Sequence, residues 1–505
     1  MNPLALFAAA LFVFPGPDPA AFDALLGGLR GQWIGPVTAQ FPRNGEGSTI
    51  RLKDGRLLHA FSRHGKSPDG NVDLWPGVIV FMESSDNARS WTPPQVVFRN
   101  TDGLTAMQPS FVRLPDGRLG VTYSLIDSFT RARKVFRFST DEGKSWSREQ
   151  VISPPGGYWT GAHDRLISIS GGRILAQLHT KLSAKPERLA TRIAYSDDSG
   201  RTWSLSPQTL SVSQVIPGSS AEKSGRGGYH EASIAERGDG SLLMLGRTMA
   251  GRIYRSVSID RGVTWSTPQP TDLRSGAAPA RLERIPGSND LLVVWNSCCL
   301  DKDNPQLGER LTLTSAISSD GGLTWKWRRT IADIVPGQSP ARHWVDYPAM
   351  TIDGGTVFLS YRAVYLDGQS TLMQNYMVPL PLSWFYAPRD RNPGATLESA
   401  RVFTDAEIRA AFGGLPSRPP TNRELHTGEH IGFKVARVEN RDGPREVQPD
   451  EDRFFYITSG SARLRVEDAR DLAMETGSAI IVPRGVPYQI LATDAKVEFL
   501  VVRVK

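Results

Sequence analysis

The chain has 505 residues, a formal net charge of +7, 48 glycines and 36 prolines. This length exceeds one ordinary core, and the glycine and proline content is typical of a turn-rich β protein. The positive charge is spread without a basic run, which argues against nucleic acid as the main partner and suits an anionic ligand. Two cysteines exclude a disulfide framework.

The N-terminal segment 3–14 is apolar and ends at Pro15-Gly16-Pro17. Twelve residues are too few to span a bilayer, but they suit the core of a signal peptide. We therefore expect residues 1–21 to be a signal peptide and the protein to be secreted or periplasmic. The rest of the sequence predicts no membrane span.

An eight-residue pattern, Ser-x-Asp-x-Gly-x-Thr/Ser-Trp, occurs five times at intervals of 55 to 62 residues. In such a turn the Asp accepts hydrogen bonds from the amides that follow, the Gly adopts a positive φ, and the Trp packs between sheets. Only the first copy departs, with Ala88 at the Gly position. Because the pattern recurs around the molecule, it indicates the fold and not an asymmetric site. The copies begin at Ser84, Ser139, Ser196, Ser258 and Ser318.

A second repeat, an apolar strand on each side of a tight turn, runs in phase with the first. Strands that flank Asp-Gly at this spacing predict β-hairpins. Six hairpins with this period predict a six-bladed β-propeller over residues 35–385, whose sixth blade lacks the Trp pattern. The turns lie at Asp54-Gly55, Asp116-Gly117, Gly171-Gly172, Asp239-Gly240, Asn289-Asp290 and Asp353-Gly354.

Residues 386–422 are rich in Pro, Arg and Gly and predict a linker. It contains one short helical stretch, opened by a capping box at Thr404 and Glu407. Short β patterns resume over residues 423–505, where Phe454–Val466 and the glycine–proline pattern that ends at Tyr488 resemble a cupin, a small jelly roll. The whole chain is thus expected to be all-β.

Metal-binding cupins hold their ion with three histidines and a glutamate, and the resemblance implies where these ligands should lie. The matching positions are Glu446, Gln448, Arg453 and Tyr488. None is histidine, and Arg453 adds positive charge where a cation should sit. We expect no metal in this domain, and a role in assembly or sugar contact.

The propeller topology assigns polar residues to one face from strand order alone. Residues before the first strand, after the second strand and before the third strand of each blade lie opposite the hairpin turns. The top of a propeller axis is a common concave site. Any single residue there is most simply a rim ion pair, but the set as a whole predicts an anion site. It comprises Arg43, Glu46, Gln108, Asp164, Arg165, His230, Glu231, Asp346, Tyr347, Arg63, His64, His179, Arg247, Arg362, Asp69, Asp73, Arg252 and Arg310.

The stretch HEASIAERGDGSLLMLGRT, from His230 to Thr248, resembles the sialidase (neuraminidase) superfamily of six-bladed propellers. The resemblance covers roughly residues 35–385. It implies that Tyr347 is a nucleophile assisted by Glu231, and that Arg247 and Arg310 grip a substrate carboxylate. The acid/base aspartate is then Asp73, or alternatively Asp69.

These residue types suit those roles. Guanidinium groups bind a planar carboxylate in a bidentate manner that lysine does not reproduce. Tyrosine has a pKa of about 10, so a neighbouring glutamate that accepts its proton makes it a better nucleophile. A neutral nucleophile also avoids repelling an anionic substrate.

The family's first clamp arginine lies in an Arg-Ile-Pro motif, and this chain departs from it. Here the stretch is Pro42-Arg43-Asn44-Gly45-Glu46. Arg43 is expected to replace that arginine from a shifted position, while Glu46 is nearer the expected place and has the opposite charge. The expected substrate-binding set is completed by Arg63, Arg165 and Asp164 on the same face.

The sequence therefore predicts an exo-α-sialidase-like glycoside hydrolase that acts on a glycan with a terminal acidic sugar, retains stereochemistry and needs no cofactor. Two alternatives stay open. One is a glycosidase or lyase for another acidic sugar, which the missing Arg-Ile-Pro motif favours. The other is a non-catalytic carbohydrate-binding propeller.

Overall fold

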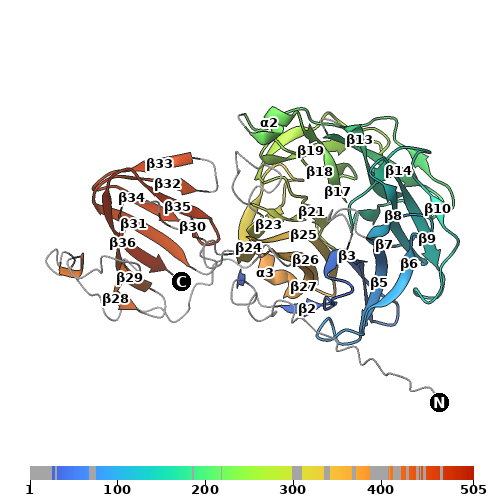
Figure 1. Cartoon of the computed structure of the whole chain (residues 1–505), viewed down its shortest axis with the longest axis horizontal. Helices are drawn as coiled ribbons and strands as arrows, with labels where there is room; N and C mark the ends of the chain where they lie inside the picture. The colour runs from blue at the N-terminus through green and yellow to red at the C-terminus, as the bar shows by residue number, and fades with distance from the viewer. Residues whose placement is uncertain are drawn as a thin grey trace, which may run out of the picture.

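The computed structural model describes residues 26–28, 31–66, 76–184, 187–217, 219–297, 310–334, 342–366, 371–386, 408, 410–412, 422–427, 431–439, 443, 445–446, 451–466 and 470–504. The expected signal peptide, Asp69, Asp73, Thr404, Glu407 and Gln448 lie outside this part of the chain. The described residues are almost entirely β, and they form a propeller and a smaller C-terminal domain (Figure 1).

The first three blades follow one another in the chain. Blade one contains β3 (Arg43–Arg51), β4 (Leu57–His64), β5 (Gly77–Ser84) and β6 (Gln95–Arg99). Blade two contains β7 (Thr105–Arg113), β8 (Leu119–Ser128), β9 (Arg131–Ser139) and β10 (Gln150–Val151). Blade three contains β12 (Leu166–Ser168), β13 (Ile174–Ala184), β14 (Glu187–Ser196) and β15 (Ser204–Leu205), with the short strands β11 (Trp159–Thr160) and β16 (Gly227–Gly228) alongside.

The other three blades complete the ring. Blade four contains β17 (His230–Glu236), β18 (Leu242–Arg247), β19 (Arg252–Ser258) and β20 (Gln269–Arg274), and the short helix α2 (Ser220–Ser224) precedes it. Blade five contains β21 (Arg281–Arg284), β22 (Leu291–Asn296), β23 (Thr312–Ser318) and β24 (Lys326–Ile334). Blade six contains β25 (Arg342–Asp353), β26 (Thr356–Leu366) and β27 (Thr371–Pro381), and the helix α3 (Leu382–Tyr386) follows it. All six predicted hairpins are confirmed.

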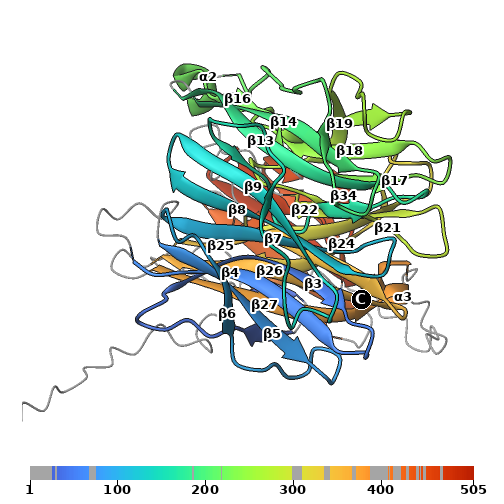
Figure 2. The same cartoon turned by 90° about the vertical axis from the view of Figure 1, so that its right-hand side faces the viewer.

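Two N-terminal strands complete the last two blades. β2 (Gln32–Ile34) pairs antiparallel with β27 and is the outer strand of blade six, while β1 (Leu26–Gly28) pairs with β24 of blade five. β2 begins three residues before the expected propeller start at residue 35. Figure 2 shows β3 and β4 of blade one beside β25, β26 and β27 of blade six, where the ring closes.

The five Trp patterns form the predicted turn with the same bonds each time. In the second copy Ser139 Oγ donates to Asp141 Oδ1 at 2.7 Å, and the Ser145 amide donates to the same oxygen at 2.8 Å. Ala88 of the first copy adopts a φ of 66° and makes the bond that Gly makes in the other copies. Each Trp packs in a hydrophobic cluster between blades: Trp91, Trp146, Trp203, Trp265 and Trp325.

The C-terminal domain consists of two facing sheets, as expected for a cupin. One sheet contains β28 (Asn422–Thr427), β29 (Ile431–Glu439), β36 (Lys496–Val504), β31 (Asp452–Ser459) and β34 (Ala479–Val482). The other contains β30 (Arg445–Glu446), β35 (Tyr488–Ala492), β32 (Ala462–Val466) and β33 (Arg470–Met474). Phe455, Leu464 and Phe499 are among the residues of the shared core.

The C-terminal domain contacts both the expected linker and the propeller. Ala411 and Phe412, within the expected linker, pack against Val435 of β29. Thr330 of β24 donates a hydrogen bond to the Gly485 carbonyl at 3.1 Å, on the side of the propeller where Figure 1 shows the smaller domain. No helix in the described ranges is long and apolar enough to cross a membrane.

Candidate active site

Four non-glycine residues with a positive φ mark the ends of inner strands away from the hairpin turns. They are Gln108 (62°), Asp164 (52°), Glu231 (49°) and Tyr347 (54°), on blades two, three, four and six. At three of them the strand pairing shifts register, as in a β-bulge. Side chains reach this region of φ only where the surroundings enforce it, and bulges redirect a side chain.

Tyr347 and Glu231 meet across the axis although they belong to blades that are not adjacent. Tyr347 Oη donates a hydrogen bond of 3.1 Å to Glu231 Oε1. The sialidase resemblance pairs these two residues, and the structure brings their side chains together.

Arg247 completes this pair. Its position in β18 is opposite His230 in β17, next to Glu231. Its Nη1 lies 2.6 Å from Glu231 Oε2 and donates a longer bond of 3.5 Å to Tyr347 Oη. One guanidinium therefore contacts both the expected nucleophile and its expected base.

Two further arginines face the ring of Tyr347 and share one carboxylate. Asp346 is fully buried and accepts from Arg310 Nη1 at 2.5 Å and from Arg362 Nε and Nη2 at 2.8 Å each. Trp344 Nε1 donates to the same carboxylate at 3.0 Å. The guanidinium carbons of Arg310 and Arg362 lie 5.4 and 4.5 Å from the centre of the Tyr347 ring.

The electrostatics keep the proton on the tyrosine in the unliganded site. Burial and the neighbouring Glu231 raise the pKa of Tyr347. Burial raises the pKa of Glu231 too, but Arg247, His230 and His179 more than offset this, and the net pKa lies below the ordinary value. The pair is therefore a neutral phenol and a carboxylate at neutral pH.

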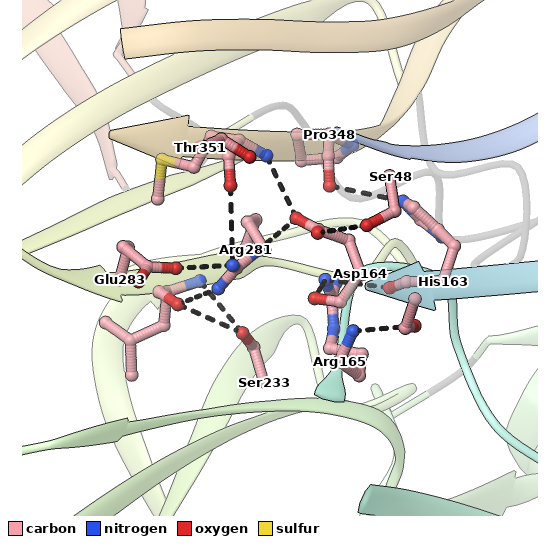
Figure 3. A network of polar contacts seen from close by, with 12 residues as sticks. Ser48, His163, Asp164, Arg165, Ser233, Arg281, Glu283, Pro348 and Thr351 are labelled. Atoms are coloured by element: carbon pink, nitrogen blue, oxygen red, sulfur yellow. Dashed lines mark hydrogen bonds and ion pairs between the residues drawn. The ribbon is translucent and has the colours of Figure 1, made fainter. Parts of the chain in front are cut away.

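Asp164 is at the centre of a buried network that joins several blades (Figure 3). Its Oδ1 accepts from Ser48 Oγ at 2.9 Å, and its Oδ2 accepts from Arg281 Nε at 2.5 Å and from the Met350 amide at 3.0 Å. Burial raises the pKa of Asp164, but Arg281 and then Arg165 lower it below its usual range. Both carboxylate oxygens are therefore occupied by protein donors.

The other arginines expected to bind substrate are held within the protein. Arg165 is buried, and it donates to the carbonyls of His163, Asp164 and Ala280. Arg63 donates to the Pro36 carbonyl at 2.8 Å and stacks 5.0 Å from the ring centre of Phe41. Arg43 is buried in β3, opposite His64. Arg63 and Arg165 therefore direct their guanidiniums to backbone carbonyls.

His163 and Lys134 are two buried groups near the site that sequence reasoning missed. The His163 ring lies 5.6 Å from that of Tyr347, and burial together with Arg165 lowers its pKa to about 3. Lys134 Nζ donates to the Gln108 carbonyl at 3.2 Å, and burial lowers its pKa to about 7. His163 immediately precedes Asp164, so its position before the first strand of blade three could have identified it. Lys134 lies inside a strand, where no sequence pattern distinguishes it.

In the C-terminal domain, Arg453 lies between the side chains expected at the metal positions. It donates to Glu446 at 2.8 Å, to Glu451 at 2.7 and 2.9 Å, and to Tyr488 Oη at 3.1 Å. Across the residues that the structure places, no group of three or more His, Cys, Asp or Glu side chains is arranged to hold a metal.

Comparison with known proteins gives two family matches. The BNR repeat-like domain matches residues 55–359, and the cupin domain matches residues 437–503. An anhydrosialidase from Macrobdella decora is 31% identical over 157 residues, which cover 28% of this chain. The aligned stretch spans only 18% of that relative.

Similar solved structures include several sialidases. The Hadza microbial sialidase Hz136 superimposes with a TM-score of 0.52 at 18% identity, over 70% of this chain and 69% of its own. The NanB sialidase of Streptococcus pneumoniae has the same TM-score at 14% identity, over 70% and 71% of the two chains. The Trypanosoma rangeli sialidase, solved as a covalent intermediate with 2,3-difluorosialic acid, matches with a TM-score of 0.52 at 11% identity over 95% of each chain. At these identities the likeness establishes the fold alone.

Proposed function

The chain belongs to the BNR repeat-like domain family, and from this premise and the geometry at the axis we propose that it is a retaining glycoside hydrolase for a terminal acidic sugar. The observation that carries the proposal is the hydrogen bond between Tyr347 Oη and Glu231 Oε1, with three arginines around the phenol ring. Families of unrelated function share this fold, so the argument rests on the site.

In the proposed reaction, the Tyr347 oxygen attacks the anomeric carbon while its proton moves to Glu231. The bond to the leaving oxygen breaks, and an acid protonates that oxygen. Water then attacks the anomeric carbon opposite the tyrosyl bond, on the face that the leaving group has vacated. The tyrosyl bond breaks, Tyr347 recovers its proton from Glu231, and the two successive inversions retain the configuration. Asp73, or alternatively Asp69, is proposed as the acid that later activates the water.

Arg247 links substrate binding to the strength of the base. In the unliganded site its ion pair with Glu231 holds the pKa of that carboxyl low, which disfavours proton transfer from Tyr347. A substrate carboxylate that binds Arg247 competes for the same guanidinium and weakens this ion pair. The pKa of Glu231 then rises, and the glutamate becomes a better proton acceptor when the substrate is in place.

Two similar proteins support an enzyme that acts on an acidic sugar, one of them through a covalent intermediate. The Trypanosoma rangeli sialidase forms a covalent intermediate with a fluorinated sialic acid, and the partial relative from Macrobdella decora is an anhydrosialidase. A binding module without catalysis needs no contact between Tyr347 and Glu231, so their separation of 3.1 Å favours an enzyme.

The test uses Tyr347→Phe and Glu231→Gln with aryl glycosides of sialic acid, its deaminated analogue and uronic acids. The wild type should hydrolyse at least one of them, and each substitution should lower kcat by roughly 10²-fold or more, because each removes a proton-transfer partner. Tyr195→Phe, on the outer part of blade three, is the control and should leave kcat unchanged.

Covalent trapping separates the mechanism from simple binding. An analogue of the preferred sugar that carries fluorine on the anomeric carbon and on the adjacent ring carbon should add the mass of the analogue less HF to the peptide that contains Tyr347, and only in protein with an intact Tyr347, because the anomeric fluoride leaves as the tyrosyl bond forms. Wild-type rates in both variants would overturn the mechanism. Binding of acidic glycans by the wild type, with no hydrolysis over days, would favour the non-catalytic propeller.

A further inference from the structure

Glu46 is a buried carboxylate at the axis that has no role in the proposed reaction. It lies on β3, the inner strand of blade one, and is only 3% exposed. Its Oε1 lies 3.9 Å from Arg362 Nη1, and Arg362 faces the ring of Tyr347. Its Oε2 has no hydrogen-bond partner in the described part of the chain. A buried carboxylate oxygen without a donor is costly, so a ligand that supplies a donor gains by binding there.

Each of the three guanidiniums around Tyr347 lies near a carboxylate of the protein. The side of the site beside Glu46 is therefore unsuited to an acid group of the ligand. The guanidiniums of Arg247, Arg310 and Arg362 face, in that order, the carboxylates of Glu231, Asp346 and Glu46. Arg362 is held in a bidentate manner by Asp346 and has Glu46 on its outer side. A ligand carboxylate placed beside Glu46 meets a like charge, which selects against it.

Gln108 lies on β7, the inner strand of blade two, which contacts β3. It has a positive φ, and its Oε1 accepts from Ser124 Oγ at 2.9 Å, so its side-chain amide nitrogen is the remaining donor. The Gln108 carbonyl accepts from Lys134, and the electrostatic influence of Glu46 on Lys134 raises the pKa that burial lowers. The Gln108 backbone amide also donates to Ser62 Oγ of blade one at 2.9 Å, and Ser62 packs against Gly45, the residue before Glu46. Glu46 and Gln108 thus lie on neighbouring inner strands.

We propose that Glu46 and Gln108 form a subsite for hydroxyl or amine groups of the sugar, opposite the Arg247 and Arg310 side that takes its acid group. Glu46 accepts a hydrogen bond through Oε2, and Gln108 donates one through its amide. The subsite lies where the Arg-Ile-Pro arginine is missing, so the sugar presents a hydrogen-bond donor there and no second anionic group. Its place rests on the proposed function, but its binding chemistry rests on the side chains of Glu46 and Gln108.

The experiment measures binding in the Tyr347→Phe background, so that it does not depend on turnover. The probes are methyl glycosides of sialic acid and glucuronic acid, each with its complete set of mono-deoxy analogues, titrated by calorimetry. One of the mono-deoxy analogues should bind the protein that keeps Glu46 more weakly than the full sugar does, by roughly tenfold to a hundredfold. In Glu46→Leu that same missing hydroxyl should have almost no further effect.

Two control variants show whether a loss of binding comes from misfolding. Glu46→Gln keeps an acceptor oxygen, so it should bind the hydroxylated sugars within a few-fold of the parent yet bind an amino analogue more weakly. Glu475→Leu, an exposed glutamate of the C-terminal domain, should bind all probes as the parent does. Thermal unfolding of each variant checks that the propeller is intact.

Three outcomes decide the matter. If removing that sugar hydroxyl weakens binding equally in Glu46→Leu and in the Tyr347→Phe protein that keeps Glu46, the subsite is overturned. When Glu46→Gln is made in protein that keeps Tyr347, the loss of one limb of the pH profile of hydrolysis, with an unchanged preference for the hydroxyl, overturns the subsite in favour of a proton-transfer role. If the wild type hydrolyses nothing but the Glu46-dependent hydroxyl preference persists, the proposed reaction fails and the subsite stands.

Discussion

At the residue scale, the site depends on single positions held in a conformation that side chains rarely adopt. Gln108, Asp164, Glu231 and Tyr347 have φ values of 49° to 62°, and each of them contacts another blade or a side chain at the axis. Such conformations cost about 1–3 kcal/mol each and persist where the surroundings impose them. Their recurrence on four inner strands shows that the propeller directs these side chains inward at the expense of local stability.

His163 makes stability depend on pH in a way that one substitution tests. Its pKa is lowered to about 3, so it stays neutral in the folded protein while the unfolded chain takes up a proton below pH ~6.5. Stability should therefore fall as pH decreases from 6.5 towards 4, by at most about 1.4 kcal/mol per pH unit for this group. His163→Gln should reduce that slope when urea unfolding is measured across the range, and equal slopes would contradict the assignment.

At the element scale, the ring is closed by a strand that the sequence repeat does not contain. Blade six lacks the Trp pattern, and its outer strand is β2, which comes from the N-terminal side. Ile34 of β2 is 2% exposed and packs with Leu57, Phe358 and Met377 between blades six and one. The first and last blades are thus joined by the packing of one short strand.

Removing that packing should open the ring. Ile34→Ala deletes three buried carbons and should lower the free energy of unfolding by about 2–5 kcal/mol. Ile259→Ala is a matched control, because Ile259 is 88% exposed in a turn of blade four and should change stability by less than about 0.5 kcal/mol. Equal midpoints of denaturant unfolding for the two variants would show that β2 does not hold the ring closed.

At the scale of the whole molecule, Asp164 joins the blades from the middle. Its side chain bonds to Ser48 of blade one, Arg281 of blade five and Met350 of blade six, while Asp164 itself precedes β12 of blade three. Each of these contacts joins residues that are distant in the sequence. Met350 lies on β25, the strand that carries Tyr347, so the network helps to fix the position of the proposed nucleophile relative to the other blades.

Breaking this network should destabilise the whole propeller. Asp164→Ala leaves Arg281 buried without its main partner and should cost about 3–5 kcal/mol in unfolding free energy. The double substitution Asp164→Leu with Arg281→Met removes both charges and should recover much of that loss. Asp197→Ala breaks an exposed ion pair with Arg173 and should cost less than about 1 kcal/mol. A loss in Asp164→Ala no larger than in this control would contradict the role.

The candidate site is predictable from the sequence only in part. Glu231, Arg247, Arg310 and Tyr347 fall on one face because strand order and turn spacing fix which strand ends lie together. Asp164, Arg165 and Arg63 satisfy the same rule, yet the structure engages them with protein partners. The sequence marks which end of a strand a residue occupies, but it does not say whether a neighbouring blade already satisfies the side chain.

Local sequence is sufficient for the repeat, the six hairpins, the blade count and the face of the site, because strand alternation and turn chemistry act over a few residues. Tertiary packing alone settles the closure by β2, the meeting of Tyr347 with Glu231, and the placing of Glu46 beside Arg362. The difference between the two sets is distance along the chain. Tyr347 and Glu231 are separated by 116 positions, and their contact depends on how whole blades pack around the axis.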